Sequence, residues 1–116
     1  MDHKLKLMVV DDSPLFRTWL IRSLSEDDRF QVVGYAVNAL DAQEKIPLLQ
    51  PDMLTLDIEM PGMSGIEFLK QLLPVHPIPV ILVSSLNLRV FDALEAGAVD
   101  FVRKPDEANG LSKEIF

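Results

Sequence analysis

Cysteine is absent from this sequence, and tryptophan and tyrosine occur once each. Without cysteine, these 116 residues form neither disulfide bonds nor thiolate metal sites. Basic residues are also scarce, because 11 Lys and Arg stand against 18 Asp and Glu and give a formal net charge of −7. An acidic surface repels nucleic-acid phosphates and anionic lipids, so we expect no direct nucleic-acid partner and no membrane partner.

Long apolar stretches are missing too. No apolar run approaches the roughly 20 residues of a membrane-spanning helix, and the N-terminal residues Met1-Asp2-His3-Lys4 have no signal-peptide pattern. We therefore expect a cytoplasmic protein. What is present is the composition of one compact domain: 116 residues, of which 48% are hydrophobic and 25% are charged.

Short apolar runs alternate with segments of helical periodicity along the chain. The apolar runs predict five strands, at residues 5–10, 31–37, 53–57, 80–83 and 98–103. Helix starts are predicted after the N-cap residues Ser13, Asn38 and Ser64, and a short fourth helix is expected to end at Gly97. Pro47 is expected to kink or shorten the second helix. This alternation predicts βαβ units, and hence an α/β domain with a parallel sheet and helices on both faces.

Polar side chains follow four of the predicted strands. Asp11 and Asp12 follow the first strand, Asp57 ends the third, Ser84 follows the fourth and Lys104 follows the fifth. Because ligands of open α/β sheets bind outside the carboxyl ends of the strands, we expect these side chains to form one site. Three converging carboxylates repel one another unless a cation lies among them, and carboxylate oxygens suit Mg²⁺.

Each of these residues has a simpler explanation when it is taken alone. An aspartate at a strand end is often a helix cap or a turn residue, and a single Lys-Pro or Ser-Ser pair is usually part of a loop. The combination is more informative than its parts. A carboxylate nucleophile, a metal ion, an ammonium group and a hydroxyl group together favour a site for phosphoryl transfer.

Longer motifs surround these residues and carry a resemblance to a known family. They are Val9-Val10-Asp11-Asp12-Ser13, the stretch from Leu56 to Gly65, Val83-Ser84-Ser85, Ala96-Gly97-Ala98, and Phe101 with Lys104-Pro105. The chain resembles the response-regulator receiver family over roughly residues 5–105. In detail it is most similar to the receiver half of chemotaxis protein-glutamate methylesterases.

The resemblance implies a fold and a phosphoacceptor. The fold would be flavodoxin-like (CheY-like), a doubly wound five-stranded parallel sheet of order 2-1-3-4-5. Asp57 would accept a phosphoryl group from a sensor histidine kinase or from a small donor such as acetyl phosphate. Asp12, Asp57 and the backbone carbonyl of Glu59 would bind Mg²⁺, with Asp11 close by or acting through water.

The resemblance also implies a switch. Ser84 would hydrogen-bond the phosphoryl group, and Lys104 would pair with its oxygens. Ser84 and Phe101 would change position together, which would repack the face formed by the fourth helix and the fourth and fifth strands. Lys104-Pro105 resembles a cis-peptide turn of the family that aims the ammonium group at the site.

The C-terminal part departs from the pattern. The segment from Ser84 to Gly97 is shorter than is usual in this subfamily, and residues 106–116 barely begin a fifth helix, so we expect the last helix to be truncated. We interpret residues 1–116 as a receiver domain from a longer protein, with an effector domain, by resemblance a methylesterase, beyond residue 116. The chain itself is expected not to be an esterase, because His3 and His76 lack a nucleophile motif nearby.

Three other interpretations stay open. A stand-alone receiver would act by binding other proteins directly, with no effector domain attached. A pseudo-receiver would be a scaffold that is never phosphorylated, but such a scaffold has no need to retain Asp12, Asp57, Ser84 and Lys104 together. A flavin-binding domain is disfavoured, because no Ser/Thr/Gly-rich phosphate loop follows the first strand.

Overall fold

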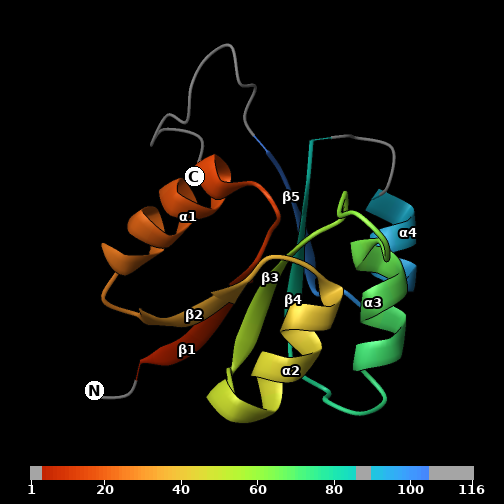
Figure 1. Cartoon of the computed structure of the whole chain (residues 1–116), viewed down its shortest axis with the longest axis horizontal. Coiled ribbons are helices and arrows are strands. Elements are labelled where there is room, and N and C mark those ends of the chain that lie inside the picture. Colours follow the sequence, from red (N-terminus) through yellow and green to blue (C-terminus); the bar gives the residue numbers. More distant parts are fainter. Residues whose placement is uncertain (1–3, 86–89, 105–116) are drawn as a thin grey trace.

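The computed structural model describes residues 4–85 and 90–104, and in this part of the chain five strands form one parallel sheet (Figure 1). The strand order is β2-β1-β3-β4-β5, which confirms the predicted order 2-1-3-4-5. The strands are β1 (Leu5–Val10), β2 (Phe30–Ala36), β3 (Met53–Asp57), β4 (Val80–Ser84) and β5 (Asp100–Arg103). The helices between them are α1 (Pro14–Ser25), α2 (Ala39–Leu49), α3 (Gly65–Leu72) and α4 (Val90–Glu95).

In the part of the chain that the structure describes, the helices cover the two faces of the sheet unequally. Helix α1 lies on one face, whereas α2, α3 and α4 lie on the other (Figure 1). Side chains alternate along β1, so that Met8 and Val10 pack in the larger core cluster with α2 and α3, and Leu7 and Val9 pack in a smaller cluster with Phe16 of α1. Helices on both faces are the expected outcome of right-handed βαβ crossovers.

The predicted N-caps are confirmed for three helices. The side chain of Ser13 accepts a hydrogen bond from the Phe16 N–H, and that of Asn38 accepts one from the Asp41 N–H. Ser64 accepts from the Glu67 N–H, as expected for the first half of a capping box. The three helix starts lie at the same edge of the sheet, because each helix follows the carboxyl end of a strand.

The structure ends α2 close to Pro47 and starts the fifth strand later than the sequence predicts. Helix α2 runs through Pro47 and ends two residues later, at Leu49, where Gln50 adopts a left-handed conformation with φ of 48°. The fifth strand starts at Asp100 rather than at residue 98. The turn at Gly97, which has φ of +106°, brings Ala98 into the larger core cluster before strand pairing begins.

Some expectations fall on residues outside the described part of the chain. These are the shortened loop at residues 86–89, the Lys104-Pro105 peptide bond and the truncated last helix within residues 105–116. Among the helices that the structure describes, none is long and apolar enough to cross a membrane.

Candidate functional site

The carboxyl ends of four strands bring the predicted side chains to one edge of the sheet. Asp57 ends β3 and Ser84 ends β4, and these two strands are paired neighbours. Asp11 follows β1 on the other side of β3, and its N–H donates to the Ala36 carbonyl of β2. Lys104 follows β5, and its N–H donates to the Ser84 carbonyl at 2.7 Å. The strand order therefore places Asp57 at the centre of the group.

Three carboxylates gather at this edge. One oxygen each from Asp11, Asp12 and Asp57 lie within 4.8 Å of one another. Asp11 and Asp57 are almost fully buried, with exposed fractions of 2% and 1%, whereas Asp12 is exposed. Among the residues that the structure describes, Oδ2 of Asp57 is a buried oxygen with no hydrogen-bond partner. An all-oxygen donor set with one open buried oxygen fits a hard divalent cation such as Mg²⁺.

The ammonium group of Lys104 lies between the two buried carboxylates. Its Nζ is 3.1 Å from Oδ2 of Asp11 and 3.3 Å from Oδ1 of Asp57. It also lies 4.7 Å from the centre of the Phe16 ring, and the side chain is only 14% exposed. The ring supplies a desolvated wall and a cation–π contact, so the ammonium group is held in place from several sides.

Burial and charge shift the ionisation of these groups. Burial, followed by the negative charge of Asp11, raises the pKa of Asp57 to about 8, although Lys104 opposes this shift. Burial also raises the pKa of Asp11, against the Ser13 N–H and Lys104. Burial alone would lower the pKa of Lys104, but the charges of Asp11 and Asp57 outweigh it and raise this pKa. The site thus holds more negative charge than one lysine neutralises, which favours binding of a further cation.

The side chain of Glu59 makes contacts that the sequence analysis did not anticipate. The backbone N–H of the same residue donates to Oδ1 of Asp57 at 3.2 Å. Its carboxylate accepts a hydrogen bond from the hydroxyl of Ser84, and Oε1 accepts from both the N–H and the hydroxyl of Ser85 at 3.1 Å each. Glu59 therefore bridges the end of β3 to the end of β4.

Arg17 is a second residue that the sequence analysis missed. Its guanidinium group donates to the backbone carbonyl of Asp11 at 2.9 Å and lies 4.5 Å from the centre of the Tyr35 ring. The N–H of Ser13 donates to Oδ1 of Asp11 at 2.8 Å. Together these bonds fix the loop that carries Asp11 and Asp12. One feature of the sequence could have indicated this role of Arg17. The helix starts at Pro14, and this start places Phe16 and Arg17 in the first turn, beside the strand ends.

The structure associates Phe101 with the hydrophobic core. It belongs to β5, is half-buried and packs against the larger core cluster. The structure thus brings Asp11, Asp12, Asp57 and Lys104 together directly, and links Ser84 to them through Glu59.

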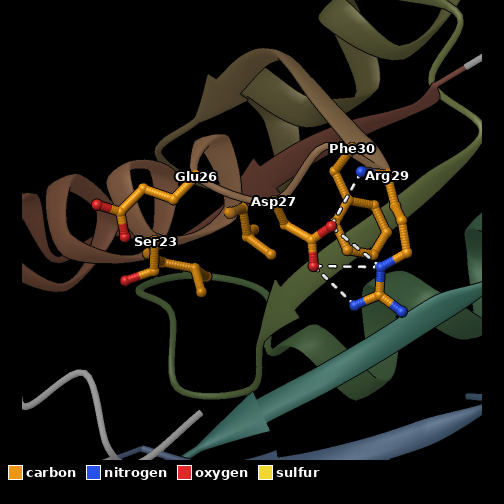
Figure 2. A pocket seen from close by; sticks show the side chains of 7 residues that line it. Ser23, Glu26, Asp27, Arg29 and Phe30 are labelled. Atoms are coloured by element: carbon orange, nitrogen blue, oxygen red, sulfur yellow. Dashed lines mark hydrogen bonds and ion pairs between the residues drawn. The ribbon is translucent and has the colours of Figure 1, made fainter.

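A hollow elsewhere on the surface does not share this chemistry. About 270 Å³ in volume, it lies at the end of α1 and the start of β2, beside Leu20, Leu24 and Phe30 (Figure 2). Two of the charged residues there pair with each other: Arg29 forms an ion pair with Asp27 at 2.7 Å. This hollow lies where β2 begins, whereas the carboxylate cluster lies where the strands end.

The fold and the cluster agree with comparisons to known proteins. The family model of the response regulator receiver domain matches residues 7–116. The chain belongs to the response regulator receiver domain family.

The relatives narrow this family further. The chain is 53% identical over 114 residues to protein-glutamate methylesterase/protein-glutamine glutaminase 2 of Syntrophomonas wolfei. The match covers 98% of this chain and 33% of that protein. The response regulator domain of Thermotoga maritima CheB is 42% identical with a TM-score of 0.83, over 89% of this chain and 80% of that one. A CheX–CheY–BeF3–Mg²⁺ complex from Borrelia burgdorferi contains a chain that is 30% identical with a TM-score of 0.80, over 95% and 86%.

The family match and these relatives identify the chain as a receiver domain similar to those of protein-glutamate methylesterases. The chain spans about a third of the length of the curated relatives that it matches.

Proposed function

We propose that Asp57 is the phosphoacceptor of this receiver domain and that phosphorylation requires Mg²⁺. The observation that carries this proposal is the buried Asp57 carboxylate, whose Oδ2 has no hydrogen-bond partner among the described residues while Oδ1 is held by Lys104 and the Glu59 N–H. A nucleophile needs one oxygen that is fixed in position and still open to an incoming phosphorus atom.

The proposed reaction is an in-line phosphoryl transfer. An Asp57 oxygen forms a bond to phosphorus, and the bond from phosphorus to the leaving group breaks. The leaving group keeps the electron pair, as the imidazole of a phosphohistidine or the acetate of acetyl phosphate. The product is an acyl phosphate on Asp57. Lys104 would bind one oxygen of the transferred group, and the 3.3 Å distance between its ammonium and Oδ1 of Asp57 supports this role.

The proposed ligands of Mg²⁺ are Asp12, Asp57 and the backbone carbonyl of Glu59, with Asp11 adjacent or acting through water. The convergence of three carboxylates supports this site, and the Mg²⁺ in the name of the Borrelia CheY complex is consistent with it. When bound, the ion would neutralise charge that develops on the phosphoryl oxygens. Asp12 is the exposed carboxylate of the three, so an ion bound there could retain several waters.

Phosphorylation would act through the proposed switch of Ser84 and Phe101. The phosphoryl group adds roughly −1.5 to −2 units of charge, and it favours states in which hydrogen-bond donors approach it. Ser84 ends β4, and Phe101 lies on the paired strand β5. Movement of the Ser84 hydroxyl toward Asp57 would therefore be coupled to the packing of the β4–β5 face.

Membership of the receiver family supports a proposal for the partners and the location. We propose a sensor histidine kinase as the phosphodonor, a cytoplasmic location, and a role as the receiver of a longer protein whose effector domain is a protein-glutamate methylesterase. The 53% identity to a methylesterase supports the last point.

Incubation of the chain with acetyl phosphate is expected to add one phosphoryl group, detected by intact mass spectrometry, only when Mg²⁺ is present. Asp12→Asn is expected to raise the Mg²⁺ concentration needed for half-maximal uptake by about tenfold or more, because it removes one charged ligand. Asp28→Asn, on the exposed turn before β2, serves as the control and should leave this concentration unchanged. Uptake that is independent of Mg²⁺, or absent from folded protein, would contradict the proposal.

A further inference from the structure

The Glu59 carboxylate accepts a hydrogen bond from the Ser84 hydroxyl, the donor that the proposed function assigns to the phosphoryl group. The Ser84 hydroxyl donates to the Glu59 carboxylate, and Ser85 donates to it twice, through its N–H and its hydroxyl. Ser84 is fully buried and Glu59 is half-buried. Hydrogen bonds to an ionised acceptor in such a partly desolvated position are stronger than those between neutral groups.

We propose that the Glu59 carboxylate is an internal competitor of the phosphoryl group for the hydroxyl donor of Ser84. A serine hydroxyl has one proton and donates to one acceptor at a time. Ser84 can therefore serve Glu59 or a phosphoryl oxygen on Asp57, but not both. Glu59 thus acts through Ser84 as a positioning residue, and this inference rests on the proposed role of Asp57 as phosphoacceptor.

Charge adds to this competition. A carboxylate beside Ser84 repels a phosphoryl group, which carries roughly −1.5 to −2 units of charge. The backbone of Glu59 stays tied to the site, because its N–H donates to Oδ1 of Asp57 at 3.2 Å. Displacement of the carboxylate then requires rotation of the side chain alone, with the β3–α3 loop kept in place. The unphosphorylated receiver is consequently stabilised by contacts that the phosphorylated receiver must give up.

The hydrogen-bond and charge contributions are separable by substitution. Glu59→Gln removes the negative charge but keeps an acceptor oxygen for Ser84. Glu59→Ala removes both. Ser84→Ala removes the donor for which Glu59 and the phosphoryl group compete, so the effect of Glu59→Ala should depend on whether the Ser84 hydroxyl is present.

The test is the affinity for beryllium fluoride, an analogue of the phosphoryl group, measured by isothermal titration calorimetry at saturating Mg²⁺. Glu59→Ala is expected to bind it about tenfold more tightly than the wild type, with a smaller gain for Glu59→Gln. In the Ser84→Ala background, the gain from Glu59→Ala should fall to about twofold or less. Glu44→Ala, at an exposed glutamate of α2, is the matched control and should change nothing.

Two results would overturn the inference. One is an unchanged affinity in folded Glu59→Ala and Glu59→Gln variants. The other is an equal gain with and without the Ser84 hydroxyl, which would attribute the effect of Glu59 to its charge alone. Failure of the proposed function has a different signature: the wild type would not bind beryllium fluoride, or Asp57→Asn would bind it as tightly as the wild type.

Discussion

Replacement of Asp57 by asparagine is expected to abolish phosphoryl uptake and, in Mg²⁺-free buffer at pH 8, to raise the free energy of unfolding by about 1–2 kcal/mol. Loss of uptake follows from removal of the carboxylate nucleophile. The gain in stability follows from the pKa of Asp57, which burial and the charge of Asp11 raise to about 8 in the folded protein. The folded wild type therefore carries a buried ionisable group whose charged form is disfavoured.

The sign of the pH dependence follows from the same shift. In the unfolded chain, an aspartate has a pKa of about 4. Between that pH and about 8, the folded protein holds a proton that the unfolded chain has released, so the stability of the wild type falls as pH rises. The advantage of Asp57→Asn should thus be largest near pH 8 and should shrink toward pH of about 4.

Urea denaturation at several pH values measures this difference. Asp28→Asn, at an exposed aspartate, is the control and should change the free energy of unfolding by less than about 0.5 kcal/mol. An Asp57→Asn variant that is less stable than the wild type at pH 8, or whose advantage grows toward low pH, would contradict the electrostatic description of the site.

Gly65→Ala is expected to destabilise the fold by about 3 kcal/mol or more, the largest effect on stability that we expect from a single methyl group. A Cβ atom at Gly65 would lie 2.2 Å from the carbonyl oxygen of Asp57 and 2.9 Å from the Cα of Ile58. These are backbone atoms at the end of β3, so relief of the clash requires α3 to move away from the strand. Phosphoryl uptake should fall as well, because the displaced backbone carries Asp57.

Gly62→Ala separates this clash from the ordinary cost of replacing a glycine. Gly62 lies in the same β3–α3 loop with φ of +82°, and a Cβ there would meet nothing within 4 Å. Its replacement should cost about 1 kcal/mol from backbone strain. At Gly65, the first residue of α3, helix propensity alone favours alanine. Equal stability losses at Gly62 and Gly65 in urea denaturation would show that the close approach to Asp57 is unimportant.

Much of the fold could be predicted because its signals are local. Ser13, Asn38 and Ser64 each stand where an apolar strand gives way to helical periodicity, and each caps a helix. Parallel βαβ topology then requires the carboxyl ends of the strands to meet, which is why Asp57 and Lys104 could be expected together from the sequence. The family resemblance supplied the strand order and the proposed roles.

The contacts that the sequence did not reveal depend on side-chain conformation. Glu59 and Ser84 are 25 residues apart, and their hydrogen bond depends on how the β3–α3 loop turns after Asp57. From the sequence alone, Arg17 resembles an ordinary exposed cation of a helix, whereas in the structure its guanidinium group donates to the Asp11 carbonyl. The start of β5 was expected too early because Ala98 is apolar, but that residue packs in the core before pairing begins.

The most direct test of the account is the chemical identity of the phosphorylated residue. After incubation with acetyl phosphate and Mg²⁺, reduction with sodium borohydride converts an aspartyl phosphate to homoserine, which peptide mass spectrometry then locates. Homoserine at position 57, and at no other aspartate, is the expected result. Homoserine at position 11 or 12 instead, or a phosphoryl group that resists reduction because it is held by a serine, would contradict the assignment of Asp57 as the phosphoacceptor.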